Sequence, residues 1–343
     1  MELSLGIPFA HRPEDALQLS AVLSHPDASH WLADHYINVY IDEEYLHRPW
    51  DGFFDADMIY TCPFLIHHSV SRATLKNLGI SIERYFISIL QEQNYIFCCV
   101  NKFYIPHYPD YHTQKRAHYI IVYGYDEEKQ LFLTADFING KFERFTCDPF
   151  SLEQGIFFCT LGNFELLDKH TNSEVLTHYF DAIFFLKNDQ KISYKFNKAL
   201  LLDSLQCYVE GRKPQGLDYI PYGKNTYEFA FGISILEVCK NIIGESRLMN
   251  IKPFYLMKMH KLLMKQRLVY LRDHKYMDNI EEYLLCNNQL QQLYTTLYLL
   301  VLKYNMTSWK SERTKKLIEL IQKAESLELR NTTAIISHIH DND

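Results

Sequence analysis

Residues 118–136, HYIIVYGYDEEKQLFLTAD, decide the fold class of this chain. The stretch opens with β-branched and aromatic residues that favour a buried strand. It then turns through the charged residues 126–129 and returns in a second apolar run that ends at Asp136. Two such runs around a short polar turn predict an antiparallel hairpin. Residues 141–145 follow a further turn and predict the next strand, so this part of the chain is expected to be a meander.

Helices and a further strand are predicted before the hairpin. Pro13 suits the first position of a helix over residues 13–23, and two acidic residues follow where the helix dipole favours them. A second helix is expected over residues 27–36. Residues 95–103 are β-branched and aromatic, which is typical of a buried strand. A helix followed by an antiparallel meander indicates an α+β protein.

The rest of the chain predicts mostly helix. Residues 174–212 read as a strand followed by a helix, with Gly211 as its C-terminal cap. Residues 227–329 are expected to be helical, since apolar residues recur at three- and four-residue spacing over residues 258–271 and 284–304. The tail from Ser337 is expected to fray, with His338 in solvent. We therefore expect an α+β domain over residues 1–212 and a helical C-terminal region over residues 213–343.

Composition narrows the functional class. The chain has 343 residues and a net charge of −7, so it shows no nucleic-acid footprint. Residues 1–8 lack a secretory pattern, and the longest strongly apolar run, residues 297–302, is far short of the roughly 20 residues of a transmembrane helix. We expect a cytoplasmic protein whose eight cysteines are reduced thiols. The first of them is Cys62.

One candidate for chemistry is the pair His118 and Asp136. In a hairpin that turns near residues 126–129, the two positions fall near each other across the ladder. A carboxylate beside an imidazole fixes the tautomer of the ring and stabilises its charged form. A purely structural hydrogen bond between the two is the alternative on spacing alone.

The loop before His118 is dense in tyrosine and histidine, and loops on a rigid sheet often carry sites. Aromatic rings with polar tips suit an amphipathic small molecule or peptide, so we expect this loop to border a cleft. The expected substrate-binding residues are Tyr104, His107, Tyr108, Tyr111 and His112. A metal site of His107, His112 and His118 is an alternative, although the spacing matches no ligand motif. No cofactor motif is present, and no cofactor or metal is expected.

Several segments together resemble a family. The strands with His118 and Asp136 resemble those of papain-fold proteins related to the N-terminal domain of butirosin biosynthesis protein H, and more distantly the leader peptidases of bacteriocin exporters. The resemblance covers residues 8 to 330, and its other matching pieces are residues 21–28, 31–40, 103–106, 231–234 and 256–270. It implies a papain-like cysteine-protease fold and a place in bacterial nonribosomal peptide or antibiotic biosynthesis.

The resemblance also implies a mechanism, from which this chain departs. Several family members transfer an acyl or aminoacyl group from a carrier-protein thioester to an amine, through a thiolate at a helix N-terminus. His118 would be the base and Asp136 its orienting partner. The nucleophile belongs at the start of the helix over residues 13–23, yet residues 5–19 contain no Cys, Ser or Thr. Glu14 and Asp15 stand there instead; Ser20 would need a shifted register, and Cys62 lies in another element.

Three hypotheses follow from the missing nucleophile. The first is an acyl-transferring or hydrolytic enzyme in which His118 acts directly as a base, alone or with Glu14 or Asp15. The second is a pseudoenzyme that binds an acyl or peptidyl carrier protein or a small product. The third is a subunit that pairs with an active paralogue or with a second copy of itself. A basic cluster that could receive an acidic carrier is formed by Arg247, Lys252, Lys258, Lys261 and Lys265, although a solvated helix face is the favoured interpretation.

Overall fold

The computed structural model describes residues 1–6, 13–42, 53–54, 61–138, 141–160, 180–214, 229–244, 249–307 and 311–341. The chain divides into two compact units, each built from two separate stretches of sequence. Unit 1 comprises residues 1–28 and 57–194, and unit 2 comprises residues 29–56 and 195–343. Residues 195–212, which are expected in the first domain, thus group with the C-terminal helices.

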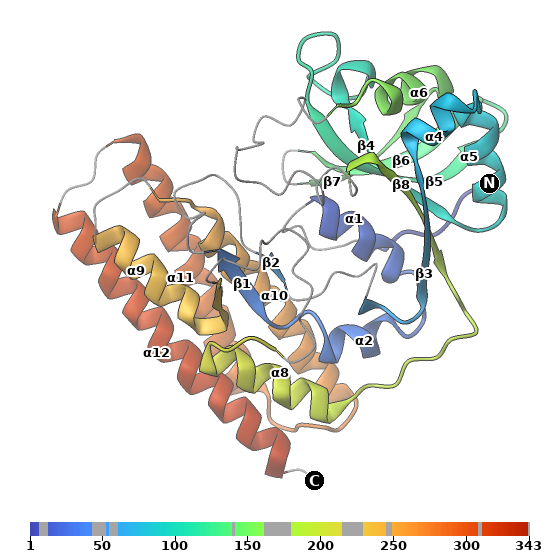
Figure 1. The fold of residues 1–343 in the computed structure, drawn as a ribbon. Helices are drawn as coiled ribbons and strands as arrows, with labels where there is room; N and C mark the ends of the chain where they lie inside the picture. Colours follow the sequence, from blue (N-terminus) through green and yellow to red (C-terminus); the bar gives the residue numbers. More distant parts are fainter. Residues whose placement is uncertain are drawn as a thin grey trace. The chain divides into compact units, whose positions relative to one another are not determined.

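Unit 1 is built on an antiparallel sheet of order β3-β8-β4-β5-β6-β7 (Figure 1). Its elements are α1 (Pro13–Val22), β3 (Leu65–Ser71), α4 (Arg72–Asn77), α5 (Ile82–Gln91), β4 (Tyr95–Asn101), the 3₁₀ turn η2 (Lys102–Tyr104), β5 (Ala117–Asp126), β6 (Leu131–Ile138), β7 (Lys141–Cys147), α6 (Pro149–Phe157) and β8 (Ala182–Asn188). The predicted hairpin and the following strand are confirmed as β5, β6 and β7. The expected strand over residues 95–103 ends early, because the Asn101 side chain accepts a hydrogen bond from the Phe103 N–H and opens the 3₁₀ turn.

The sheet carries helices on both faces (Figure 1). On one face, Phe86 of α5 contacts Phe132 of β6 at 6.0 Å between ring centroids. On the other face, the Ser24 hydroxyl just after α1 hydrogen-bonds to the Tyr95 hydroxyl at 2.8 Å. The central strand β4 is buried along its whole length, as a sheet covered on both sides requires.

The hairpin contains a bulge that lets the N-terminus approach. The register between β5 and β6 shifts between Val122 and Gly124. Beside the bulge, the Leu3 N–H donates to the Tyr123 carbonyl and the Tyr125 N–H donates to the Met1 carbonyl, each at 2.8 Å. A Cβ at Gly124 would lie 2.6 Å from the Met1 oxygen, so the close approach of the two backbones requires glycine here.

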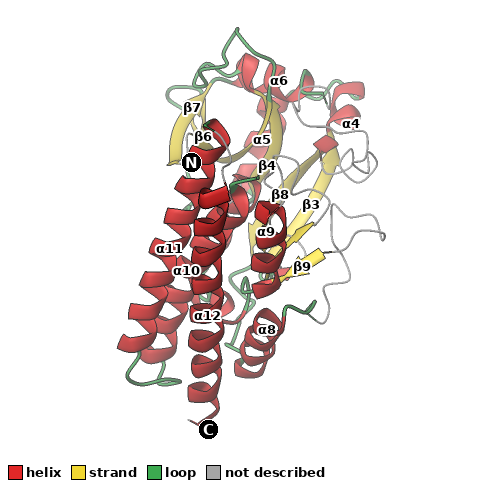
Figure 2. Cartoon of the chain, turned by 90° about the vertical axis from the view of Figure 1, so that its left-hand side faces the viewer, coloured by secondary structure: helices red, strands yellow, loops and turns green. Residues whose placement is uncertain are grey.

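Unit 2 combines helices with a small antiparallel sheet of order β2-β1-β9. Its helices α10, α11 and α12 run side by side (Figure 2). The elements are α2 (Ala28–Asp34), which begins at the unit boundary, β1 (Val39–Asp42), β2 (Phe53–Phe54), α8 (Lys198–Glu210), β9 (Phe229–Phe231), the 3₁₀ turn η4 (Gly232–Ser234), α9 (Ile235–Gly244), α10 (Lys252–Asp273), α11 (Glu281–Met306) and α12 (Ser311–Asp341). Gly211 caps α8 with φ 65°, as predicted.

Three expectations for this region are wrong. Residues 229–231 form a strand instead of helix, because they pair with β1 far away in the sequence. The tail does not fray at Ser337, since α12 continues to Asp341 and His338 contacts Asp278 and the Tyr283 hydroxyl at 2.8 and 3.1 Å. Lys261 belongs to no basic surface, since it is buried and its ammonium lies 2.6 Å from a Glu328 carboxylate oxygen. Arg247 lies outside the described residues.

Candidate functional site

The strand register brings His118 and Asp136 together. Ile121 of β5 faces Ala135 of β6, so Asp136 lies opposite residue 120 and on the same sheet face as His118, two residues along. The His118 Nδ1 lies 3.0 Å from an Asp136 Oδ2 atom. The two side chains thus lie within hydrogen-bond distance across the hairpin, while their catalytic roles stay predictions.

Asp136 is a fully buried carboxylate that accepts hydrogen bonds at both oxygens. Its Oδ1 accepts from the Phe137 N–H at 2.5 Å, and its Oδ2 accepts from the Tyr108 hydroxyl at 2.5 Å and from His118. Removing a carboxylate from water costs several kcal/mol, and only such donors offset this cost. The position of the carboxylate is therefore set by the strand and the loop together.

Tyr108 makes a contact that the sequence does not predict. It is buried, and its hydroxyl is committed to Asp136, so it positions the carboxylate instead of presenting its hydroxyl to a substrate. Burial and the neighbouring Asp136 raise the pKa of Tyr108 well above its ordinary value, which keeps the phenol protonated as a donor. No local sequence pattern marks this role, because it depends on how the loop folds back over β6.

The His118 ring is held with one defined nitrogen toward the carboxylate. Its Nδ1 also lies 3.1 Å from the Tyr119 carbonyl oxygen, so this nitrogen faces two acceptor oxygens. We therefore assign the proton to Nδ1, which leaves the lone pair of the neutral ring on Nε2. The side chain is 24% exposed, so the ring is reachable from solvent. A partly exposed imidazole oriented by a buried carboxylate has the geometry of a general base.

The other predicted substrate-binding residues form ring contacts along the loop. His107 stacks on Phe145 with ring centroids 4.2 Å apart and places its Nε2 3.4 Å from a Glu143 oxygen. Tyr111 stacks on His112 at 3.9 Å, and Tyr104 contacts Phe158 at 5.4 Å. Among the described residues no group of three His, Cys, Asp or Glu side chains could hold a metal, so the alternative site of His107, His112 and His118 is not assembled.

The C-terminal end of α1 lies on the other face of the sheet from His118. Val100 is opposite His118 in the ladder and lies against Gly155 of α6, whereas Tyr95 points to the opposite face and contacts the end of α1. Asp15 is half-buried, and the side chain of Glu14 lies outside the described residues. A partnership of either residue with His118 therefore stays a prediction.

The two alternative nucleophiles are buried. Ser20 is fully buried, and its hydroxyl donates to the Leu17 carbonyl at 2.6 Å. Burial raises the pKa of Cys62 to about 12, which makes its thiol inert near neutral pH. All eight cysteines are buried free thiols. No thiol among the described residues is therefore presented beside His118 at the surface.

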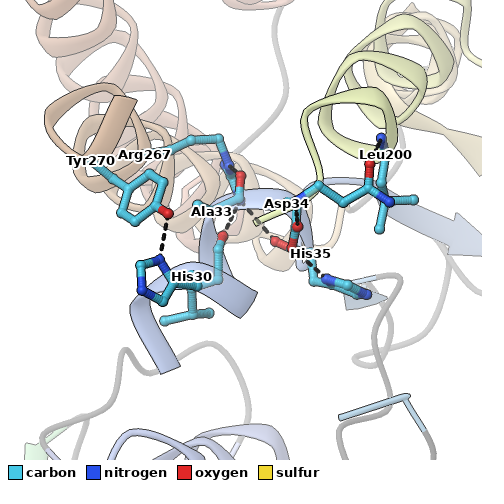
Figure 3. A network of polar contacts seen from close by, with 9 residues as sticks. His30, Ala33, Asp34, His35, Leu200, Arg267 and Tyr270 are labelled. Carbon is cyan, nitrogen blue, oxygen red and sulfur yellow. Dashed lines mark hydrogen bonds and ion pairs between the residues drawn. The ribbon is translucent and has the colours of Figure 1, made fainter. Parts of the chain in front are cut away.

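Unit 2 contains a second histidine–aspartate pair, shown in Figure 3. His35 Nδ1 lies 2.7 Å from an oxygen of the buried Asp34, and the other Asp34 oxygen accepts from the Asn197 N–H at 2.5 Å. Next to it, Arg267 donates to the carbonyls of three residues at the end of α2, namely Leu32, Ala33 and His35. Asp34 connects the end of α2 to the residue that precedes α8. Because this contact is structural, a variant that breaks the pair is a matched control for variants of His118 and Asp136.

Comparisons with known proteins add no relative. No protein-family model matches the chain, and no curated protein matches it. In the described residues no helix is both long and apolar enough to cross a membrane.

Proposed function

We propose that the protein transfers acyl or aminoacyl groups in bacterial nonribosomal-peptide-type biosynthesis, on a papain-like fold, with His118 as general base and no covalent thiol intermediate. The observation that carries this is the buried Asp136 carboxylate. The Tyr108 hydroxyl and the Phe137 N–H hold this carboxylate in place, and the carboxylate orients the partly exposed imidazole of His118. The position of His118 and Asp136 on the neighbouring strands β5 and β6 of an antiparallel sheet supports the papain-like assignment. A cytoplasmic location belongs to the proposed function, because carrier-protein thioesters are made there.

The chemistry uses one base and no enzyme nucleophile. An acceptor amine attacks the thioester carbonyl carbon while His118 Nε2 takes the proton from its nitrogen. The carbon–sulfur bond then breaks, and the imidazolium returns the proton to the departing thiolate, which yields an amide and a thiol. Asp136 stabilises the imidazolium between these steps, as carboxylates do in histidine-dependent catalysis. Water in place of the amine gives hydrolysis by the same route.

The test is thiol release from a simple thioester. The wild-type protein is mixed with an alanyl N-acetylcysteamine thioester and hydroxylamine as the amine, and free thiol and hydroxamate are measured. His118→Ala is expected to lose about 100-fold or more in rate, the usual contribution of a general base. His35→Ala, which breaks the pair in unit 2, should retain the rate. Equal rates in wild type and His118→Ala would contradict the proposed role.

A non-catalytic binding role is the second candidate. It is favoured by the burial of all eight thiols and by the position of α1 on the face opposite His118. The protein would then bind an acyl or peptidyl carrier protein, or pair with an active paralogue or a second copy. Its signature is binding of a phosphopantetheine-bearing carrier protein, unchanged in His118→Ala, with no thioester turnover above buffer. Turnover that depends on His118 would contradict it.

A further inference from the structure

Two cysteines far apart in the sequence meet in the core of unit 1. Cys99 lies in the central strand β4, and Cys159 follows the end of α6. Their sulfur atoms are 3.8 Å apart although 60 residues separate them. Both are buried free thiols. A disulfide requires a sulfur–sulfur distance of about 2.05 Å, so an approach of less than about 2 Å would join them.

A buried cation is fixed beside this pair. The Arg72 guanidinium donates to the carbonyls of Ile156 at 3.0 Å and Cys159 at 3.3 Å, and also to the Phe180 carbonyl. It also lies 4.5 Å from the centre of the Phe180 ring. These contacts hold a positive charge against the backbone of Cys159 itself. Such a charge stabilises a thiolate, which is the reactive form of cysteine.

The two thiols are not equivalent. Burial would raise the pKa of Cys159, but the hydrogen bond between Cys159 and Cys99 and the Arg72 charge outweigh burial and lower it below the ordinary value. Burial and the neighbouring Cys159 raise the pKa of Cys99 well above the ordinary value. Cys159 is therefore the nucleophilic thiol of the pair, and Cys99 is the protonated partner.

We propose that Cys99 and Cys159 form an oxidisable pair that closes to an intramolecular disulfide. Hydrogen peroxide is the oxidant. The Cys159 thiolate attacks one peroxide oxygen, the oxygen–oxygen bond breaks, and Cys159 sulfenic acid and hydroxide form. Cys99 then attacks the sulfenic sulfur, which forms the sulfur–sulfur bond; the thiol proton and the departing hydroxide leave as water. Two thiols are thereby oxidised and one peroxide is reduced.

The disulfide would join β4 to the segment after α6, which contacts the tyrosine- and histidine-rich loop before β5. The Asn101 side chain donates to the Phe158 carbonyl at 3.1 Å, and the Tyr104 ring rests against the Phe158 ring. Asn101 lies two residues after Cys99, and Phe158 directly precedes Cys159. The disulfide therefore lies at the base of the loop that delivers Tyr108 to Asp136.

The test counts thiols. The purified protein is treated with hydrogen peroxide, denatured, alkylated with N-ethylmaleimide and weighed by mass spectrometry. We expect alkylated thiols to fall from eight to six, with two hydrogen atoms lost in mass, and dithiothreitol to restore eight. Eight alkylated thiols after peroxide treatment would overturn the inference.

Cysteine variants are needed to identify which two thiols form the disulfide, because tryptic peptide mapping alone cannot distinguish neighbouring cysteines. One tryptic peptide, residues 85–102, contains both Cys98 and Cys99, and another, residues 145–169, contains both Cys147 and Cys159. Cys159→Ala and Cys99→Ala should each keep all seven remaining thiols, whereas the matched Cys98→Ala and Cys147→Ala should still lose two. If one of the first two variants does not fold, the other decides. Loss of two thiols in a folded Cys159→Ala or Cys99→Ala would show that a different pair is oxidised.

Discussion

Tyr108→Phe tests whether the Tyr108 hydroxyl holds Asp136 in place, and it leaves the His118 side chain unchanged. The change removes only the phenolic oxygen that donates to Asp136 Oδ2 at 2.5 Å. A hydrogen bond to a charged group contributes about 1.5–3 kcal/mol, and both partners here are buried, so we expect a loss in that range. For a unit of this size the loss corresponds to a fall in Tm of about 3–12 °C.

The assay is urea and thermal unfolding, followed by circular dichroism, of wild type and two variants. The matched control is Tyr111→Phe in the same loop, whose side chain is 37% exposed and should lose less than about 0.5 kcal/mol. Because the raised pKa keeps Tyr108 protonated at neutral pH, the donor is present throughout the measurement. If Tyr108→Phe costs no more than Tyr111→Phe, the Tyr108 hydroxyl does not hold Asp136 in place.

Two further predictions concern the buried charges of unit 2. Burial, together with the charges of Lys261 and Arg267, holds the pKa of His260 well below its ordinary 6.5. The unfolded chain therefore binds a proton that the folded chain does not, and stability should fall by about 1.4 kcal/mol per pH unit as the pH drops below 6.5. Urea unfolding at pH 7 and pH 5 should show this slope, and His260→Phe should lack it; equal slopes would contradict the burial of a neutral ring. Lys261→Met leaves the buried Glu328 carboxylate with the Tyr294 hydroxyl at 2.9 Å and should cost about 3–5 kcal/mol. The double variant Lys261→Met/Glu328→Leu should recover most of that loss in the same assay, and no recovery would show that the cost comes from packing.

Local patterns predicted the hairpin well because its signals lie within a few residues. The apolar runs of β5 and β6 and the polar turn between them specify pairing without distant partners. The same holds for the Gly211 cap, whose left-handed conformation ends α8. The strand β9 could not be predicted in this way, because three residues carry too little periodicity and their partner β1 is almost two hundred residues earlier in the sequence.

In the candidate site, too, the sequence predicted one contact and missed another. The proximity of His118 and Asp136 follows from counting residues around one turn, so spacing alone predicted it. Tyr108 was expected to contact a substrate, and the structure turns it inward onto Asp136 instead. The direction of a loop side chain depends on packing against a strand that comes later in the chain, which local propensity does not encode.

The sequence by itself determined the α+β class, the meander, the helical C-terminal part and the lack of Cys, Ser and Thr in residues 5–19. These are properties of residue type and short-range spacing. Only the tertiary structure decided that α1 and His118 lie on opposite sheet faces, that Lys261 meets Glu328, and that Cys99 meets Cys159. The last two of these are contacts that each close a long loop, and their formation depends on the packing of whole elements, because chain entropy opposes distant contacts until burial offsets it.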